Sequence, residues 1–269
     1  MIRVQFLAVL SCAALLFLGA GDTRPDAWPE LPVDRFQVTF RDDFEALDIS
    51  GARGAGARWY AHTPWNGDFG EAKFADPGPQ SPFSRLPHGL RITARQGDDG
   101  RWRSGLISSK DAIGPAGGFS QRYGYFEIKA RLPSGDGVWP AFWLAGVANP
   151  APSPEVDIFE FYGRWPDAYR VTTHLWEGQR DRLNAQSVVR VSRGSLSDRY
   201  NLYGVWIQPD VTTFYFNRRP VAQQKTPPAF NRPFYILVDL ALGGGWPVDQ
   251  LKGEQYMDIE YVQAMALRP

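Results

Sequence analysis

The most restrictive feature of the sequence is an alternation of apolar and polar residues at every second position. In YGYFEIKARL (123–132), Phe126 and Ile128 fall on one side of an extended chain, while Glu127 and Lys129 fall on the other. A period of two is that of a β-strand with one buried face. No long segment after residue 21 has the three-to-four spacing of apolar residues that an amphipathic helix needs. The chain therefore has to bury its apolar surface in sheets.

Further segments fit the same architecture. LYGVWIQPDVTTFYFNRRPV (202–221) is typical of strands joined by turns at Pro209-Asp210 and Asn217-Arg218. FYILVDLAL (234–242) is an apolar run that suits a strand buried on both faces, and YMDIEYVQAMAL (256–267) alternates again. Clusters of Gly, Pro, Asn and Asp separate the segments. The sequence predicts an all-β protein, a sandwich of antiparallel sheets.

The N-terminus has the layout of a secretory signal peptide. Arg3 precedes an apolar run from Val4 to Leu18, and small residues follow at 19–21. The run is shorter than the ~20 apolar residues of a membrane-spanning helix, which makes an uncleaved anchor the weaker alternative. We expect removal of residues 1–21, a single domain over 22–269, and a secreted or periplasmic protein.

Charge and cysteine content limit the classes of partner. The formal net charge is +0 and the pI is about 6.8, so nothing draws the chain electrostatically to nucleic acid, or to a membrane once the signal is removed. Cys12 is the only cysteine and lies in the expected signal peptide. The mature chain would then have neither disulfides nor thiolate metal sites. We expect a monomer that depends on its apolar core.

Aromatic residues are abundant, with 10 Trp, 11 Tyr and 17 Phe. Flat apolar rings stack well on sugar faces, but large rings also fill the core of a β-sandwich. Composition leaves both uses open.

Three carboxylates stand close together in PEVDIFEFYG (154–163): Glu155, Asp157 and Glu160. In a regular strand Glu155 and Asp157 share a face, whereas Glu160 points to the opposite one. A β-bulge adds one residue and resets the alternation, and bulges are frequent beside active sites. A bulge within Ile158-Phe159 would bring all three carboxylates to one face and leave the apolar residues to the core.

Two glutamates arranged in this way have a chemical use. Retaining glycoside hydrolysis needs two carboxyl groups ~5–5.5 Å apart, one as nucleophile and one as acid/base. Like charges so close cannot all stay ionised, so one pKa must rise, which supplies the protonated acid. The alternative is a solvated polar face on an outer strand, which needs no bulge.

The blocks SQRYGYFEIKARLPSGDGVWPAFWLAG, PEVDIFEFYG, THLW and LALGGGWP resemble glycoside hydrolase family 16, in order and spacing, from about residue 35 to the C-terminus. The motif E-x-D-x-x-E resembles the bulge-containing branch, which includes laminarinases and bacterial exopolysaccharide glycanases. The resemblance implies a curved jelly-roll sandwich with an open concave cleft. By position, Glu155 would be the nucleophile, Glu160 the acid/base and Asp157 the assisting carboxylate.

The same resemblance implies residues that contact the sugar. Each has core packing or a structural role as its alternative. These candidates are Trp139, Trp143, His174 and Trp246. Trp65 and Asn66 are candidates on their own chemistry, because they belong to a loop whose side chains suit a hydroxyl-rich ligand.

The resemblance also bears on cofactors. Many family members hold a structural calcium away from catalysis, for which Asp43 and Glu260 are the candidate ligands here, although both acids suit a plain surface role equally well. No cofactor is required for the reaction, and no metal is expected at the catalytic site.

Two features depart from the family pattern. The family often has arginine where this chain has Lys129, so a bidentate fork is lost, and the block WYAHTPWNGDFGEAKFADPGP (59–79) is unlike common laminarinase loops.

We therefore expect a retaining endo-β-glycanase that hydrolyses internal bonds of a polysaccharide through a covalent glycosyl-enzyme. The substrate would be a β-1,3- or β-1,3-1,4-glucan or a succinoglycan-like exopolysaccharide. The alternatives are a transglycosylase that uses the same site and a non-catalytic carbohydrate-binding protein.

Overall fold

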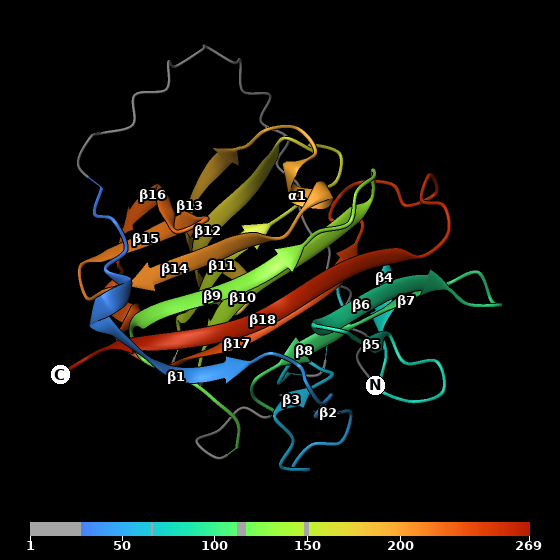
Figure 1. Cartoon of the computed structure of the whole chain (residues 1–269), viewed down its shortest axis with the longest axis horizontal. Helices are drawn as coiled ribbons and strands as arrows, with labels where there is room; N and C mark the ends of the chain where they lie inside the picture. Colours follow the sequence, from blue (N-terminus) through green and yellow to red (C-terminus); the bar gives the residue numbers. More distant parts are fainter. Residues whose placement is uncertain (1–27, 66, 112–116, 148–150) are drawn as a thin grey trace.

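Two stacked β-sheets form the protein in a computed structural model that describes residues 28–65, 67–111, 117–147 and 151–269 (Figure 1). The expected signal peptide lies outside the described residues. The predicted all-β sandwich is confirmed, and strands pair antiparallel except for two short parallel pairs at the edges, β2 with β3 and β4 with β7. Within the described residues, no helix has both the length and the apolar character needed to cross a membrane.

The eight-stranded sheet carries the three carboxylates. Its strands, in spatial order, are β13 (Arg180–Arg190), β12 (Ala168–Glu177), β11 (Ser153–Glu160), β10 (Val138–Gly146), β17 (Phe234–Leu242), β8 (Leu106–Ser108), β3 (Trp59–Tyr60) and β2 (Ile49–Ser50).

The ten-stranded sheet covers its inner face. Its main path runs through β16 (Arg219–Lys225), β15 (Val211–Phe216), β14 (Asn201–Ile207), β9 (Gly124–Arg131), β18 (Gln255–Leu267), β6 (Gly89–Gln96), β7 (Trp102–Ser104) and β4 (Ala72–Phe74). Off this path, β1 (Phe36–Asp42) pairs with β18, and β5 (Phe83–Leu86) pairs with β6. The helical elements are short: η1 (Val33–Arg35), α1 (Ser195–Asp198) and η2 (Pro228–Phe230).

The core lies between the sheets and follows the predicted alternation. Phe126 and Ile128 of β9 face inward and are fully buried, and all nine residues of β17 are buried. The turn predicted at Asn217-Arg218 joins β15 to β16, and both residues have positive φ (50° and 61°), as a two-residue hairpin of type I′ requires.

A buried carboxylate, Glu127 of β9, lies on the other face of the ten-stranded sheet. Arg218 donates to both of its oxygens at 3.0 Å, and Tyr125, Tyr261 and Gln263 donate to them at 2.8 Å. A buried charge needs such a complete set of donors.

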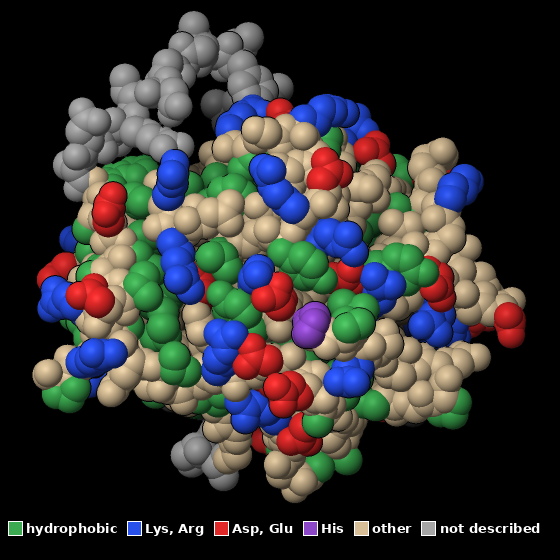
Figure 2. All heavy atoms as spheres, viewed as in Figure 1, with side chains coloured by type: hydrophobic (Ala, Val, Ile, Leu, Met, Phe, Trp, Pro, Cys, Tyr) green, Lys and Arg blue, Asp and Glu red, His purple; other side chains and the backbone are tan. Residues whose placement is uncertain are grey.

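The molecular face seen in Figure 2, where β9, β14 and β18 lie in front, carries basic and acidic side chains interspersed. Arg91 and Arg131 both pair with Asp258 there, and Lys129 pairs with Glu260. This face presents no surface of a single charge sign, in keeping with the net charge of +0.

Candidate active site

A β-bulge in β11 sets the direction of the three carboxylates. Opposite β10, Phe142 pairs with Phe159 and Trp143 with Asp157, so Ile158 is the inserted residue. Ile158 and Phe159 both belong to the core between the sheets. The bulge predicted at these positions is confirmed. Glu155, Asp157 and Glu160 consequently lie on the outer face of the eight-stranded sheet, which we call the site face.

The neighbouring strands place matched rows of side chains beside the carboxylates. On β12, His174 is in register with Glu155, Thr172 with Asp157, and Arg170 with Glu160. On β10, the corresponding partners are Ala145, Trp143 and Ala141. Small alanine side chains next to both glutamates leave the carboxyl groups accessible from the site face.

The ring of His174 lies close to three carboxylates. Its Nε2 lies 3.0 Å from Asp157 Oδ2 and 4.0 Å from Glu155 Oε1, while its Nδ1 lies 2.7 Å from Asp181 Oδ2. Burial lowers the pKa of His174, but the hydrogen bonds to Asp157 and Asp181 and the charge of Glu155 outweigh burial and raise the pKa to about 10. The ring is therefore an imidazolium at neutral pH, and both its nitrogens donate.

Glu160 is held by two hydrogen bonds to one oxygen. Trp139 Nε1 and the Tyr162 hydroxyl each donate to Glu160 Oε1 at 3.1 Å. Burial and the charge of Asp157 raise the pKa of Glu160 to about 7, against the opposite effect of these two donors. Oε1 is occupied by donors, so Oε2 is the oxygen left to carry a proton.

Glu155 has a raised pKa too. Burial, followed by the charge of Asp157, raises it to about 8, while His174 and a hydrogen bond from Trp176 act in the opposite direction. Two neighbouring carboxyl groups with raised pKa values share protons as a pair, so near neutral pH the pair holds a proton that one group can donate. The charge of His174, whose Nε2 lies 4.0 Å from Glu155 Oε1, stabilises an anion on Glu155. Burial nevertheless raises the pKa of Glu155 slightly above that of Glu160, so the pKa values do not assign the shared proton, and its place on Glu160 is part of the proposal below.

The group Glu155, Asp157 and His174 also has three potential ligand atoms within 4.8 Å of one another. A metal would need a nitrogen lone pair on His174. Both ring nitrogens are engaged with carboxylates, so this group fits a proton network rather than a cation.

A chain of aromatic rings, which we call the aromatic chain, passes Glu160 on the site face. Successive centroids are 5.0 to 6.1 Å apart, in the order Trp246, Trp165, Tyr162, Trp139, Phe69, Trp143 and Trp65. Gly244, with φ of +61°, lets the backbone before Trp246 approach the rings, because a Cβ there would lie 2.7 Å from Trp139 and 2.8 Å from Tyr162.

The predicted sugar contacts occupy different depths of this surface. Trp65 is 44% exposed, and Trp139 and Trp246 are half-buried. Trp143 is only 6% exposed beneath Trp65 and Phe69, so it forms part of the floor. Asn66 lies outside the described residues. Sugar contact by these residues stays a prediction.

Sequence reasoning missed several residues that hold the site. Tyr162 directly follows the acidic motif and could have been noticed, and Asp239 interrupts the apolar run of β17. Asp239 is fully buried, accepts from Trp143 Nε1 at 2.8 Å, and burial raises its pKa to about 8. Asp181 gave no signal, because it reaches His174 only through the register of the β12–β13 hairpin.

The two acids considered for calcium each have a basic partner. Asp43 pairs with Arg41, and Glu260 pairs with Lys129 at 2.8 Å. A carboxylate paired with a cation is a poor calcium ligand. Binding of a structural calcium elsewhere in the protein stays a prediction.

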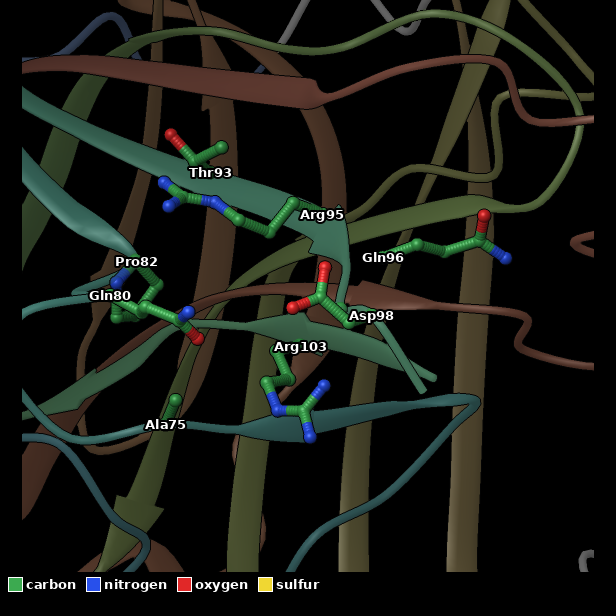
Figure 3. Close-up of a pocket in the computed structure, with 9 residues that line it drawn as sticks. Ala75, Gln80, Pro82, Thr93, Arg95, Gln96, Asp98 and Arg103 are labelled. Carbon is green, nitrogen blue, oxygen red and sulfur yellow. The ribbon is translucent and has the colours of Figure 1, made fainter. Parts of the chain in front are cut away.

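Figure 3 shows a separate small hollow between β6, β7 and the segment that contains Gln80 and Pro82. It is lined mainly by polar side chains, including Thr93, Arg95 and Arg103, and it includes none of the residues described above.

Comparison with known proteins decides the family. The profile of glycosyl hydrolases family 16 matches residues 86–263, a range that contains the carboxylate motif and its two neighbouring strands. The chain belongs to glycosyl hydrolase family 16.

Two curated relatives are endo-1,3-1,4-beta-glycanases by name. Endo-1,3-1,4-beta-glycanase EglC of Rhizobium meliloti is 30% identical over 261 residues, which are 88% of this chain and 54% of the relative. Endo-1,3-1,4-beta-glycanase ExsH of the same organism is 31% identical over 264 residues, with the same coverage of 88% and 54%. The chain thus spans about half the length of these curated relatives.

The family 16 fold is also seen in solved structures. The laminarinase catalytic domain of Thermotoga maritima is 20% identical, with a TM-score of 0.68 over 87% of this chain and 99% of that domain. This likeness confirms the jelly-roll sandwich.

Proposed function

We propose that the protein is a retaining endo-β-glycanase, with Glu155 as nucleophile and Glu160 as acid/base. The observation that carries this proposal is the bulge at Ile158, which brings both glutamates to one face, where Trp139 and Tyr162 donate to one oxygen of Glu160. A solvated polar strand would need neither feature.

In the first step, Glu160 gives its proton to the glycosidic oxygen while a Glu155 oxygen attacks the anomeric carbon. The bond from that carbon to the leaving sugar breaks, and an ester bond to Glu155 forms. In the second step, Glu160 takes a proton from water, whose oxygen displaces Glu155 from the anomeric carbon. Both glutamates return to their starting protonation states.

Asp157 and His174 serve as positioning residues in this scheme. The ion pair between Asp157 and His174, 3.0 Å long, holds the Asp157 carboxylate in position between the two glutamates. Asp181 contacts the other ring nitrogen of His174 and fixes the orientation of the ring. Backbone amides of Leu175 and Leu183 in turn donate to Asp181 at 3.2 Å. This network keeps the acids in place while one proton moves.

The names of the two Rhizobium relatives support a β-1,3-1,4-linked glucan backbone, and a succinoglycan-like exopolysaccharide is the more specific form of this proposal. We also propose that residues 1–21 are a signal peptide and that the protein acts outside the cytoplasm as a monomer. The charged start and the apolar run from Val4 to Leu18 support export.

The test uses Glu155→Ala and Glu160→Ala, with Glu177→Ala, an exposed acid at the end of β12, as the matched control. On mixed-linkage β-glucan, both site variants should lose activity while the control retains it. On an aryl β-glycoside whose leaving group needs no proton, Glu160→Ala should keep the first step and Glu155→Ala should not. Full activity of either variant on the glucan contradicts the assigned roles.

Product analysis by NMR tests the stereochemistry. The first products should retain the β configuration, and immediate inversion rules out the covalent intermediate. Growth of longer oligosaccharides without release of reducing ends would instead identify transglycosylation, and binding of the glucan with no bond cleavage would identify a carbohydrate-binding protein.

A further inference from the structure

Arg170 places a guanidinium on the site face beside Glu160. It lies on β12 in register with Glu160 on β11, two and four residues before Thr172 and His174, which share its face. Its guanidinium carbon lies 5.3 Å from the centroid of Tyr162 and 5.8 Å from that of Trp165. These contacts fix the position of the cation through ring faces of the aromatic chain.

Neighbouring arginines have carboxylate partners, whereas Arg170 has none among the described residues. Arg164 pairs with Asp136 at 3.0 Å, and Arg190 pairs with Asp167 at 3.4 Å. Over the part of the chain that the structure describes, Arg170 makes ring contacts but no ion pair and no hydrogen bond. Its N–H donors are therefore available to a ligand on the site face.

Other side chains around Arg170 do not neutralise it. Glu160, in register on β11, already accepts from Trp139 and Tyr162, and its raised pKa keeps it partly protonated. Val188, in register on β13, is apolar and 56% exposed. Two rings hold the half-buried guanidinium of Arg170 on the site face without a carboxylate partner among the described residues, which favours a role in binding a ligand.

We propose that Arg170, Tyr162 and Trp165 form a subsite for a sugar unit that bears a carboxylate. The proposal rests on the proposed glycanase function and assigns to Arg170 the selection of acidic polysaccharides over neutral ones at this site. The guanidinium presents parallel N–H donors that match a planar carboxylate, while the exposed ring of Trp165 packs against the apolar face of the sugar.

The experiment compares kcat/KM on mixed-linkage β-glucan with kcat/KM on the same glucan carrying carboxylates, introduced by C6 oxidation in one sample and by succinylation in another. Wild type, Arg170→Gln and Arg170→Lys are measured on each. Arg170→Gln should lower kcat/KM on at least one carboxylated glucan about tenfold more than on the neutral glucan, mainly through KM. Arg170→Lys, which keeps the charge but loses the fork, should fall between the two.

Arg190→Gln is the matched control, because it removes a cation on the adjacent edge strand that is 60% exposed. It should change the ratio of the two rates by less than about twofold, since exposed charges contribute little. An equal loss on neutral and carboxylated glucans in Arg170→Gln overturns the proposal, as does an equal effect of Arg190→Gln. A sulfated sample of the same glucan is measured alongside, and a preference for it over the carboxylated samples that depends on Arg170 overturns the choice of ligand.

Failure of the proposed function would be visible separately, because the wild type would then cleave none of these polymers. In that case, binding of neutral and carboxylated oligosaccharides to wild type and Arg170→Lys, measured by calorimetry, still decides whether Arg170 selects the carboxylate.

Discussion

Replacing Tyr162 by phenylalanine should move the alkaline limb of the activity profile to higher pH. The hydroxyl donates to Glu160 Oε1 at 3.1 Å and lowers the pKa of that carboxyl, which burial otherwise raises. A hydrogen bond to a charged group contributes about 1.5 kcal/mol, and one pKa unit corresponds to 1.36 kcal/mol, so the shift should be about one pH unit. Phenylalanine keeps the ring stacked on Trp139.

The direction follows from the protonation states. Glu160 must hold its proton to act on the leaving oxygen, so activity falls as pH rises through the last deprotonation of the pair. Losing a donor destabilises the anion, so that deprotonation occurs at higher pH. The assay is kcat/KM on mixed-linkage β-glucan between pH 5 and 10, with Tyr256→Phe as control, since its hydroxyl donates to Glu254 far from the site. An unmoved alkaline limb, or one moved to lower pH, would refute the reasoning.

Three further outcomes are expected. His174→Gln should lower kcat at least tenfold, because Asp157 and Asp181 lose the cation between them. The pKa of His174 is raised to about 10, so the free energy of unfolding that wild type gains over this variant, measured in urea, should shrink as pH rises from 7 through 10. A difference from wild type that does not change with pH would contradict the ion pair. Asp239→Asn should gain stability relative to wild type as pH rises from 5 to 8. The buried carboxyl has a pKa raised to about 8, so wild type loses stability over this range while the variant does not. A stability difference that stays constant would show that Asp239 does not titrate there. Glu127→Ala should lower the free energy of unfolding by about 3 kcal/mol, because Arg218 loses its buried partner. At a temperature where the variant is folded, kcat/KM should be unchanged, since Glu127 lies on the other sheet. A specific loss of activity would contradict this separation.

The sequence predicted the fold and the central motif because both depend on local periodicity. Strands such as β9 and β18 alternate in the sequence itself, and the bulge follows from the conflict between that alternation and a shared face for Glu160. These inferences needed no knowledge of which strands are neighbours.

Residues that act across strands could not be predicted in the same way. Asp181 reaches His174 only because of the register between β12 and β13, and Arg170 meets Glu160 only because the bulge shifts the register between β11 and β12. Nothing local in their segments distinguishes these residues from surface charges. The burial of Trp143 likewise depends on Phe69 and Trp65, which come from a distant loop.

The aromatic chain gives the protein a built-in optical probe. Its indoles lie within 5.0 to 6.1 Å of neighbouring rings, and one of them donates directly to Glu160. Tryptophan emission and near-ultraviolet circular dichroism should therefore change when a sugar displaces water from this surface or when Glu160 loses its proton. Oligosaccharide occupancy can thus be followed on the unlabelled chain, even in a variant that has lost all turnover.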